Sequence, residues 1–132
     1  FIVINCDTFV TFDFKEAIMF HQKNNSDITV ITSKKNLRLP FGQIKKNKSN
    51  KIINILEKPN FEFILNVGCY ILNKNITKFI PSNKPFDAPD LLNKVINKGL
   101  RVYSYDIQDY DWMEIGHLDS LSEISKNLEI LK

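Results

Sequence analysis

The chain has 132 residues, of which 43% are hydrophobic and 25% are charged, and its formal net charge is +3. This composition is typical of a globular domain with a real core and argues against a disordered or fibrous chain. The lysines are spread along the chain, with some local clustering at Lys34-Lys35 and Lys45-Lys46-Asn47-Lys48, and do not form the basic, aromatic-rich face of a nucleic-acid-binding protein. No apolar run is long enough to span a membrane. We therefore expect one domain, residues 1–132, with neither a nucleic-acid partner nor a membrane partner.

The two cysteines, Cys6 and Cys69, lack metal-ligand spacing and lie in apolar, strand-like segments. Buried, reduced thiols in a cytoplasmic protein are the simplest interpretation. The sequence leaves the oligomeric state open, with a homo-oligomer as one option.

The first seven residues form an apolar run, Phe1 to Ile4, that ends on Asn5, Cys6 and Asp7. An unbroken β-branched and aromatic run predicts a strand covered on both faces, as in a parallel sheet flanked by helices. Asp7 would then lie at the carboxyl end of the strand, where α/β proteins bind ligands, although it could equally begin a turn. Because such a strand needs a neighbour, we expect the chain to be the later part of a larger domain.

A helix and a second strand follow. Asp13 and Glu16 have the spacing of a capping box, and a buried stripe then contains Phe14, Ala17, Ile18 and His21. We interpret His21 as a packed residue rather than a metal ligand. Residues 28–32 form the next strand, so this βαβ unit predicts that the first two strands run parallel.

Two segments, residues 43–45 and 51–56, indicate a hairpin that ends at Glu57-Lys58-Pro59. The charged side chains at this end either face water or meet a ligand. In the strand predicted for residues 66–72, Gly68 indicates a bulge or the close approach of a ligand or another backbone.

The remaining segments complete an α/β pattern. We expect a short helix at residues 74–80, with Ile76, Phe79 and Ile80 inward, and a half-exposed strand at 101–106. Between them, Asp87 caps a helix that ends at Gly99 and buries Leu91, Leu92, Val95 and Ile96. Glu114 lies among bulky apolar neighbours, so it should be paired, metal-bound or directed into a cleft. An amphipathic helix is expected from Asp119 onward.

Several motifs occur together in a characteristic order: Asn5-Cys6-Asp7, Pro40-Phe41-Gly42, Glu57-Lys58-Pro59, Asn66-Val67-Gly68-Cys69-Tyr70 and Trp112-Met113-Glu114-Ile115-Gly116. This ordered set, which extends over nearly the whole chain, resembles the sugar-1-phosphate nucleotidylyltransferases. The resemblance implies an α/β fold with a Rossmann-like mixed, mostly parallel sheet flanked by helices. It also implies an enzyme that makes a nucleotide sugar and pyrophosphate from a nucleoside triphosphate and a hexose 1-phosphate.

The resemblance also implies roles for individual residues. Asp7 and Glu114 would hold a catalytic Mg²⁺, and Lys58 would contact the sugar phosphate. The sugar pocket would be lined by Gly42, Glu57, Asn66 and Gly68. These residue types suit the chemistry, because Mg²⁺ prefers hard oxygen ligands and lysine supplies a point positive charge to phosphate.

The sequence departs from the family pattern at three points. Glu114 stands where aspartate is more usual, His117 stands where threonine is common, and the glycine-rich triphosphate loop is absent. We therefore expect the 132 residues alone to be inactive, as the C-terminal portion of a nucleotidyltransferase domain. The alternative is a non-catalytic regulatory or assembly subunit that binds a sugar phosphate or a partner chain. A nucleic-acid module using residues 45–51 would require steeply salt-dependent binding.

Overall fold

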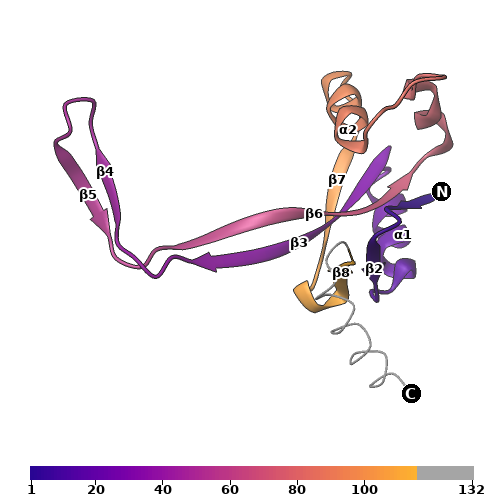
Figure 1. Ribbon diagram of the computed structural model, residues 1–132. Helices are drawn as coiled ribbons and strands as arrows, with labels where there is room; N and C mark the ends of the chain where they lie inside the picture. Colours follow the sequence, from indigo (N-terminus) through magenta and orange to yellow (C-terminus); the bar gives the residue numbers. More distant parts are fainter. Residues whose placement is uncertain (116–132) are drawn as a thin grey trace, which may run out of the picture.

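The structure, a computed structural model, describes residues 1–115 (Figure 1). The predictions for Gly116, His117 and the helix from Asp119 lie outside these residues. The elements in chain order are β1 (Ile2–Ile4), β2 (Thr8–Val10), α1 (Phe14–Lys23), β3 (Ile28–Arg38), β4 (Gln43–Lys46), β5 (Ile52–Leu56), β6 (Asn60–Leu72), the 3₁₀ helix η1 (Lys74–Phe79), α2 (Ala88–Asn97), β7 (Val102–Ile107), the 3₁₀ turn η2 (Asp109–Asp111) and β8 (Trp112–Glu114).

The main sheet of the described residues has the strand order β1-β6-β3-β7. Strand β6 is antiparallel to β1 and to β3, whereas β7 is parallel to β3. Three strands of this sheet therefore run in one direction and β6 runs against them, which confirms the predicted mixed α/β fold. β1 and β3 do run in the same direction, as the βαβ pattern predicts, but β6 lies between them.

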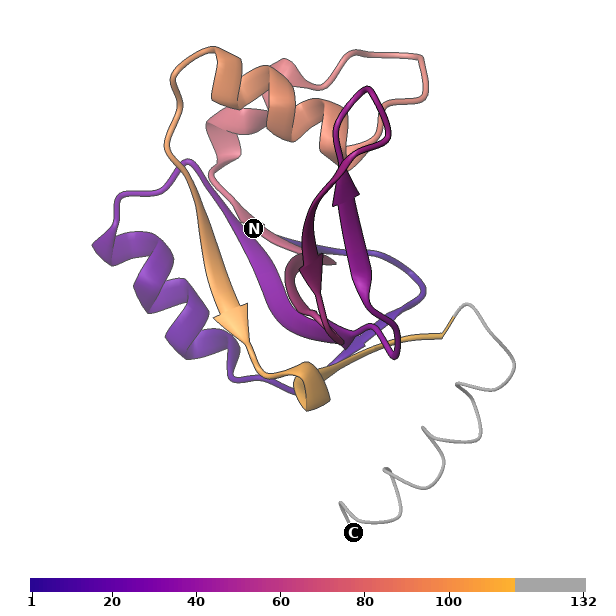
Figure 2. The same cartoon turned by 90° about the vertical axis from the view of Figure 1, so that its left-hand side faces the viewer.

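The two helices cover opposite faces of this sheet (Figures 1 and 2). Because side chains alternate along a strand, Ile31 and Cys69 pack in the cluster that contains Ala17 of α1, whereas Ile28 and Tyr70 pack in the cluster that contains α2. The α2 residues of that cluster include the buried Leu91 and Val95. The predicted stripes are thus largely confirmed, but Ile96 is 52% exposed and Ile80 is also exposed.

Helix α1 begins where the sequence predicts. The side chain of Asp13 accepts a hydrogen bond from the Lys15 backbone N–H, and Glu16 lies in the first turn. His21 is buried, and its ring nitrogens lie 2.8 Å from Thr29 Oγ1 and 3.2 Å from Asn73 Oδ1. His21 therefore joins α1 to the sheet, as expected for a packed residue.

The expectation that the first strand is covered on both faces is wrong. Residues Phe1 to Ile4 are each 40 to 53% exposed, and within residues 1–115 the only strand paired with β1 is β6. Cys6 is exposed as well, whereas Cys69 is buried. An apolar run predicts a strand. It does not show how many other elements pack on that strand, because this depends on the tertiary structure.

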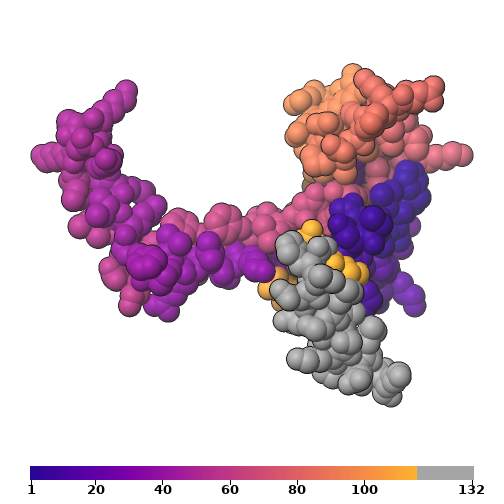
Figure 3. Space-filling view, viewed as in Figure 1, coloured from indigo at the N-terminus to yellow at the C-terminus, as the bar shows by residue number. Residues whose placement is uncertain are grey.

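Strands β3 and β6 continue beyond the sheet as a two-stranded arm. The pairing of β3 with β7 ends at Ser33, but its pairing with β6 continues to Arg38 opposite Asn60. The β4–β5 hairpin extends from the far end of this arm and stands away from the body of the molecule (Figures 1 and 3). The predicted hairpin is confirmed, whereas the strand predicted for residues 66–72 begins earlier, at Asn60.

Candidate functional site

Asp7 lies in a tight turn directly after β1, at its carboxyl end. The turn runs from Asn5 to Thr8 and is closed by a hydrogen bond of 3.2 Å from the Thr8 N–H to the Asn5 carbonyl. Asp7 is half-buried, and its own carbonyl accepts a 2.7 Å hydrogen bond from the N–H of Ile115. The backbone of Asp7 is therefore fixed from two sides.

The pairing of β2 with β8 brings the second predicted carboxylate to this turn. Glu114 lies directly opposite Thr8, so its backbone is one residue removed from Asp7 in the antiparallel ladder. The two acids are 107 positions apart in the sequence, yet the strand pairing makes their backbones neighbours. Glu114 is exposed. The free-energy cost of burying a carboxylate, which its apolar sequence neighbours suggest, therefore does not arise for Glu114.

Gly68 lies in an irregularity of β6 next to the Asp7 turn. The register passes from Val30 opposite Tyr70 to Thr32 opposite Asn66, so β6 contains the extra residues of a bulge. Gly68 has φ +79, and a Cβ at this position would lie 2.5 Å from Nδ2 of Asn5. The glycine therefore permits both a left-handed backbone and a close approach, as the sequence predicts.

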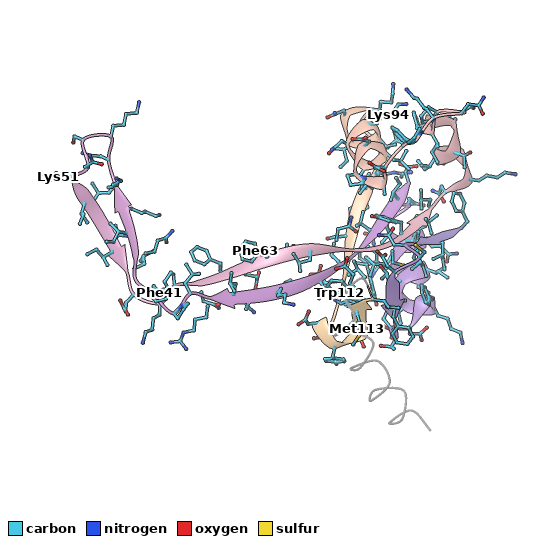
Figure 4. All side chains as sticks on the ribbon, in the orientation of Figure 1. Phe41, Lys51, Phe63, Lys94, Trp112 and Met113 are labelled. Atoms are coloured by element: carbon cyan, nitrogen blue, oxygen red, sulfur yellow. The ribbon has the colours of Figure 1, made fainter. Side chains whose placement is uncertain are left out.

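Three other predicted residues lie at the far end of the arm, where β4 begins and β5 ends. Gly42 is close to Glu57: a Cβ on Gly42 would lie 3.0 Å from Glu57 Oε2. Lys58 follows in the loop to β6, with φ +44 and an exposed side chain. Figure 4 shows Phe41, the neighbour of Gly42, at the bend of the arm, and Trp112 and Met113 of β8 at the body.

The predicted site residues therefore form two groups in this structure. Asp7, Glu114, Asn66 and Gly68 lie around the Asp7 turn, whereas Gly42, Glu57 and Lys58 lie at the other end of the arm. From Asn66 to Asn60 the arm extends over six residues of β6, or about 20 Å. The sequence motifs predict these residues as site residues, but they do not show the distance between the two groups.

The Asp7 turn suits a hard divalent cation by its donor chemistry. Asp7 and Glu114 supply carboxylate oxygens, and Mg²⁺ in phosphate-transferring sites often uses one or two carboxylates together with substrate phosphates and water. Among residues 1–115 there is no cluster of three or more His, Cys, Asp or Glu side chains arranged to hold a metal.

The sequence interpretation did not single out the side chains of Thr8 and Tyr70. The Thr8 hydroxyl donates to the Val67 carbonyl at 3.3 Å, and the Tyr70 hydroxyl accepts from Asn66 Nδ2 at 2.8 Å. The one available signal was Gly68, which indicated a close approach without identifying the group that approaches.

A polar pocket of about 320 Å³ was also not predicted. It lies between α1, β7 and η2, and its carboxylates are those of Asp13, Glu16, Asp106 and Asp111. Within it, burial and then the negative charge of Glu16 raise the pKa of Tyr105, whose hydroxyl donates to Glu16 at 3.3 Å.

Comparison with solved structures defines the class of fold. The crystal structure of HddC from Yersinia pseudotuberculosis is similar to this chain with a TM-score of 0.66 and 24% sequence identity, covering 97% of this chain and 55% of HddC. A second structure of that protein, complexed with GMP-PN, also has a TM-score of 0.66, with 25% identity. The chain thus has the α/β fold of HddC, over about half of its length.

Sequence comparison then identifies the family. Residues 1–130 match the family model described as nucleotidyl transferase, and the chain belongs to this family. It is 28% identical to the UTP–glucose-1-phosphate uridylyltransferase of Synechocystis over 98% of the chain, and 31% identical to the mannose-1-phosphate guanyltransferase of Yarrowia lipolytica over 88%. The resemblance drawn from the ordered motifs is therefore confirmed.

The chain spans about a third of the length of these relatives, 37% of the first and 32% of the second. No helix in residues 1–115 has the length and hydropathy needed to cross a membrane.

Proposed function

We propose that the full-length protein containing this chain makes a nucleotide sugar and pyrophosphate from a nucleoside triphosphate and a hexose 1-phosphate. Residues 1–132 would be the C-terminal portion of its nucleotidyltransferase domain. The observation that carries the proposal is the β2–β8 pairing, which makes the backbones of Asp7 and Glu114 neighbours, in a chain of the nucleotidyl transferase family. The relatives' names differ in both base and sugar, so the proposal specifies neither.

The reaction is an in-line attack by a phosphate oxygen of the sugar 1-phosphate on the α-phosphorus of the triphosphate. A bond forms between these atoms, the α–β bridging bond breaks, and pyrophosphate leaves. The second pKa of a phosphomonoester is about 6, so the nucleophile is already ionised near pH 7 and needs no general base. Catalysis then consists of positioning and charge neutralisation.

The chain's own residues have separate tasks in this proposal. The carboxylates of Asp7 and Glu114 would hold Mg²⁺, which, when bound, neutralises charge on the phosphates. Lys58 would place its ammonium against the sugar phosphate, and Glu57, Gly42, Asn66 and Gly68 would line the sugar pocket. A single pocket requires the arm to bring the two groups closer than the about 20 Å that separates them in this structure. Gly42 supports a role in the pocket because its missing side chain leaves room for the Glu57 carboxylate.

Pyrophosphate release by the full-length protein tests the metal site. A screen over triphosphates and hexose 1-phosphates should reveal one productive combination that requires a divalent metal. Asp7→Asn should lower that rate by about 100-fold or more, because a metal that neutralises transition-state charge contributes several kcal/mol. An unchanged rate in this variant would contradict the proposed metal site.

The same assay tests Lys58. Lys58→Ala should raise the KM for the sugar phosphate about 10-fold or more, since a hydrogen bond to a charged group contributes about 1.5–3 kcal/mol. Lys48→Ala is the matched control, because it removes the same charge from the exposed tip of the β4–β5 hairpin. Equal effects of the two variants would show a general electrostatic effect instead of a contact.

The second candidate function is a non-catalytic regulatory or assembly subunit that keeps the fold. Glu114 favours this interpretation, because it stands where the family more often has aspartate and its longer side chain would place the carboxylate differently relative to a metal. Such a subunit would release no pyrophosphate in any combination, yet it would still bind a sugar phosphate or a partner chain. We also propose that residues 1–132 alone are inactive, which nucleotide-sugar formation by this chain would refute.

We further propose the cytoplasm as the compartment of this protein. Cys6 and Cys69 are both free thiols in the structure, as expected for a reducing environment. Fractionation of the source cells, followed by detection of the protein, tests this assignment.

A further inference from the structure

Lys34 lies where β3 leaves the main sheet. The pairing of β3 with β7 ends at Ser33, so Lys34 is the first residue of the arm. Strands β1, β3 and β7 run in the same direction, and Asp7 and Lys34 therefore follow the carboxyl ends of their strands in the sheet, the edge at which α/β proteins bind ligands. Only β6 separates β1 from β3, so these two strands are about 10 Å apart, half of the distance of about 20 Å along the arm.

The side chain of Lys34 lies on the same face of the sheet as that of Asn66. Thr32 is directly opposite Asn66, and side chains two positions apart on a strand share a face. Lys34 is opposite Ile64, so Lys34 and Asn66 are diagonal neighbours. Such neighbours are about 7–8 Å apart, within reach of a long side chain. Lys34 can therefore reach the surroundings of a residue that the family resemblance places in the sugar pocket.

The ammonium of Lys34 has a weak partner within the chain. Its Nζ lies 3.6 Å from Oδ2 of Asp106, and the two side chains are 51% and 44% exposed. This distance is longer than a hydrogen bond, and an exposed ion pair of this kind contributes little to stability. The other oxygen of Asp106 accepts a hydrogen bond from the Thr32 hydroxyl at 2.6 Å, which fixes the carboxylate. Asp106 therefore keeps the ammonium near this edge of the sheet and leaves its donors available to an anion.

From this placement we propose that Lys34 is a further substrate-binding residue, which contacts the phosphate of the hexose 1-phosphate. The inference rests on the proposed function, which supplies this ligand. A phosphomonoester has a charge of about −1.5 to −2 near pH 7 and three acceptor oxygens, so it accommodates both Lys34 and Lys58. Lys34 is near the Asp7 turn without movement of the arm, whereas Lys58 is not. On binding, the exposed Lys34 side chain turns from Asp106 to the phosphate.

The kinetic test uses the full-length protein with its productive pair of substrates. Lys34→Ala should raise the KM for the hexose 1-phosphate about 10-fold and leave kcat nearly unchanged, because it removes a hydrogen bond to a charged group. Lys34→Arg should retain most of the affinity. Lys35→Ala is the matched control, because it removes the same charge from the next residue, which is exposed and lies on the other face of the arm, opposite Phe63. It should leave the KM unchanged.

Two further measurements separate a phosphate contact from an ion pair that only joins β3 to β7. Asp106→Asn keeps an oxygen that accepts from the Thr32 hydroxyl but removes the charge that competes with phosphate for Lys34, so it should not raise the KM. The free hexose should inhibit the wild type and Lys34→Ala with the same inhibition constant, because it has no phosphate. An equal rise in KM for Asp106→Asn and Lys34→Ala, or a matching loss of affinity for the free hexose, would refute the contact.

The outcomes distinguish this inference from the proposed function. If the protein releases pyrophosphate but Lys34→Ala behaves like Lys35→Ala, the role of Lys34 is refuted and the proposed function stands. If no combination of substrates releases pyrophosphate, the proposed catalysis fails. Calorimetric titration with glucose 1-phosphate and mannose 1-phosphate, the sugar phosphates in the relatives' names, then tests Lys34 by the same loss of about 10-fold in affinity. Binding of neither sugar phosphate would overturn both proposals.

Discussion

Replacement of Gly68 by alanine tests the close approach at the β6 bulge. The new side chain would have two costs. A left-handed backbone, here φ +79, costs about 1–2 kcal/mol for a residue with a Cβ. The Cβ would also lie 2.5 Å from Asn5 Nδ2 and 2.9 Å from Asn5 Cγ, and overpacking of this kind typically costs about 1–3 kcal/mol. We therefore expect the free energy of unfolding to fall by about 2–5 kcal/mol.

Gly99 provides a control within the same chain. It has φ +73, but a Cβ there would meet nothing within 4 Å, so Gly99→Ala should cost only the backbone term, about 1–2 kcal/mol. Urea unfolding of the full-length variants measures both values. An Asn5→Ala background removes the two shortest contacts and leaves Thr8 Oγ1 at 3.2 Å, so Gly68→Ala should then cost less, closer to the value for Gly99→Ala. The reasoning is refuted if the two glycine substitutions cost the same in the wild-type background.

Two further predictions concern buried groups. His21→Ala should lower the free energy of unfolding by about 2–3 kcal/mol in the same assay, because it leaves the buried Thr29 hydroxyl without its partner. A loss below about 0.5 kcal/mol, the size of a weak surface contact, would contradict this role. Burial raises the pKa of Cys69 from 9.0 to about 11, so at pH 8 iodoacetamide should modify Cys6 and leave Cys69 intact until the protein is unfolded, as counted by mass spectrometry. The pKa of Cys69 is higher in the folded than in the unfolded state, so its contribution to stability is complete below pH 9 and should be lost between about pH 9 and 11. The free energy of unfolding should therefore fall with pH in this range, and Cys69→Ala should make that fall smaller.

Local sequence signals predicted the local structure well. Asp13 caps α1 because a short acceptor side chain before an amphipathic stripe suits that position, and the structure contains this contact. Gly68 predicted a bulge or a close approach, and both are present. The backbone proximity of Asp7 and Glu114 agrees with the family resemblance, whereas nothing in their sequence neighbourhoods joins residues so far apart.

The features that the sequence did not predict depend on long-range pairing. Lys34, Lys35 and Asn36 have no apolar alternation, so they were not assigned to a strand, yet backbone hydrogen bonds to β6 extend β3 through them. The exposure of Phe1 could not be predicted either, because the hydropathy of a side chain does not show which residues pack against it in the folded protein. Likewise, the hydrogen bond from Asn66 to the Tyr70 hydroxyl could not be predicted, because it depends on the conformation of the bulge.

The arm formed by β3 and β6 has a mechanical consequence. Because Lys58 lies at one end and Asp7 near the other, the two can act on a single phosphate only when the ribbon curves enough to bring its ends together. A change of about 10° at the root of a lever about 20 Å long moves its tip by about 3.5 Å, which exceeds the length of a hydrogen bond. The curvature of these two hydrogen-bonded strands therefore sets the distance between the Lys58 amine and the Asp7 carboxylate.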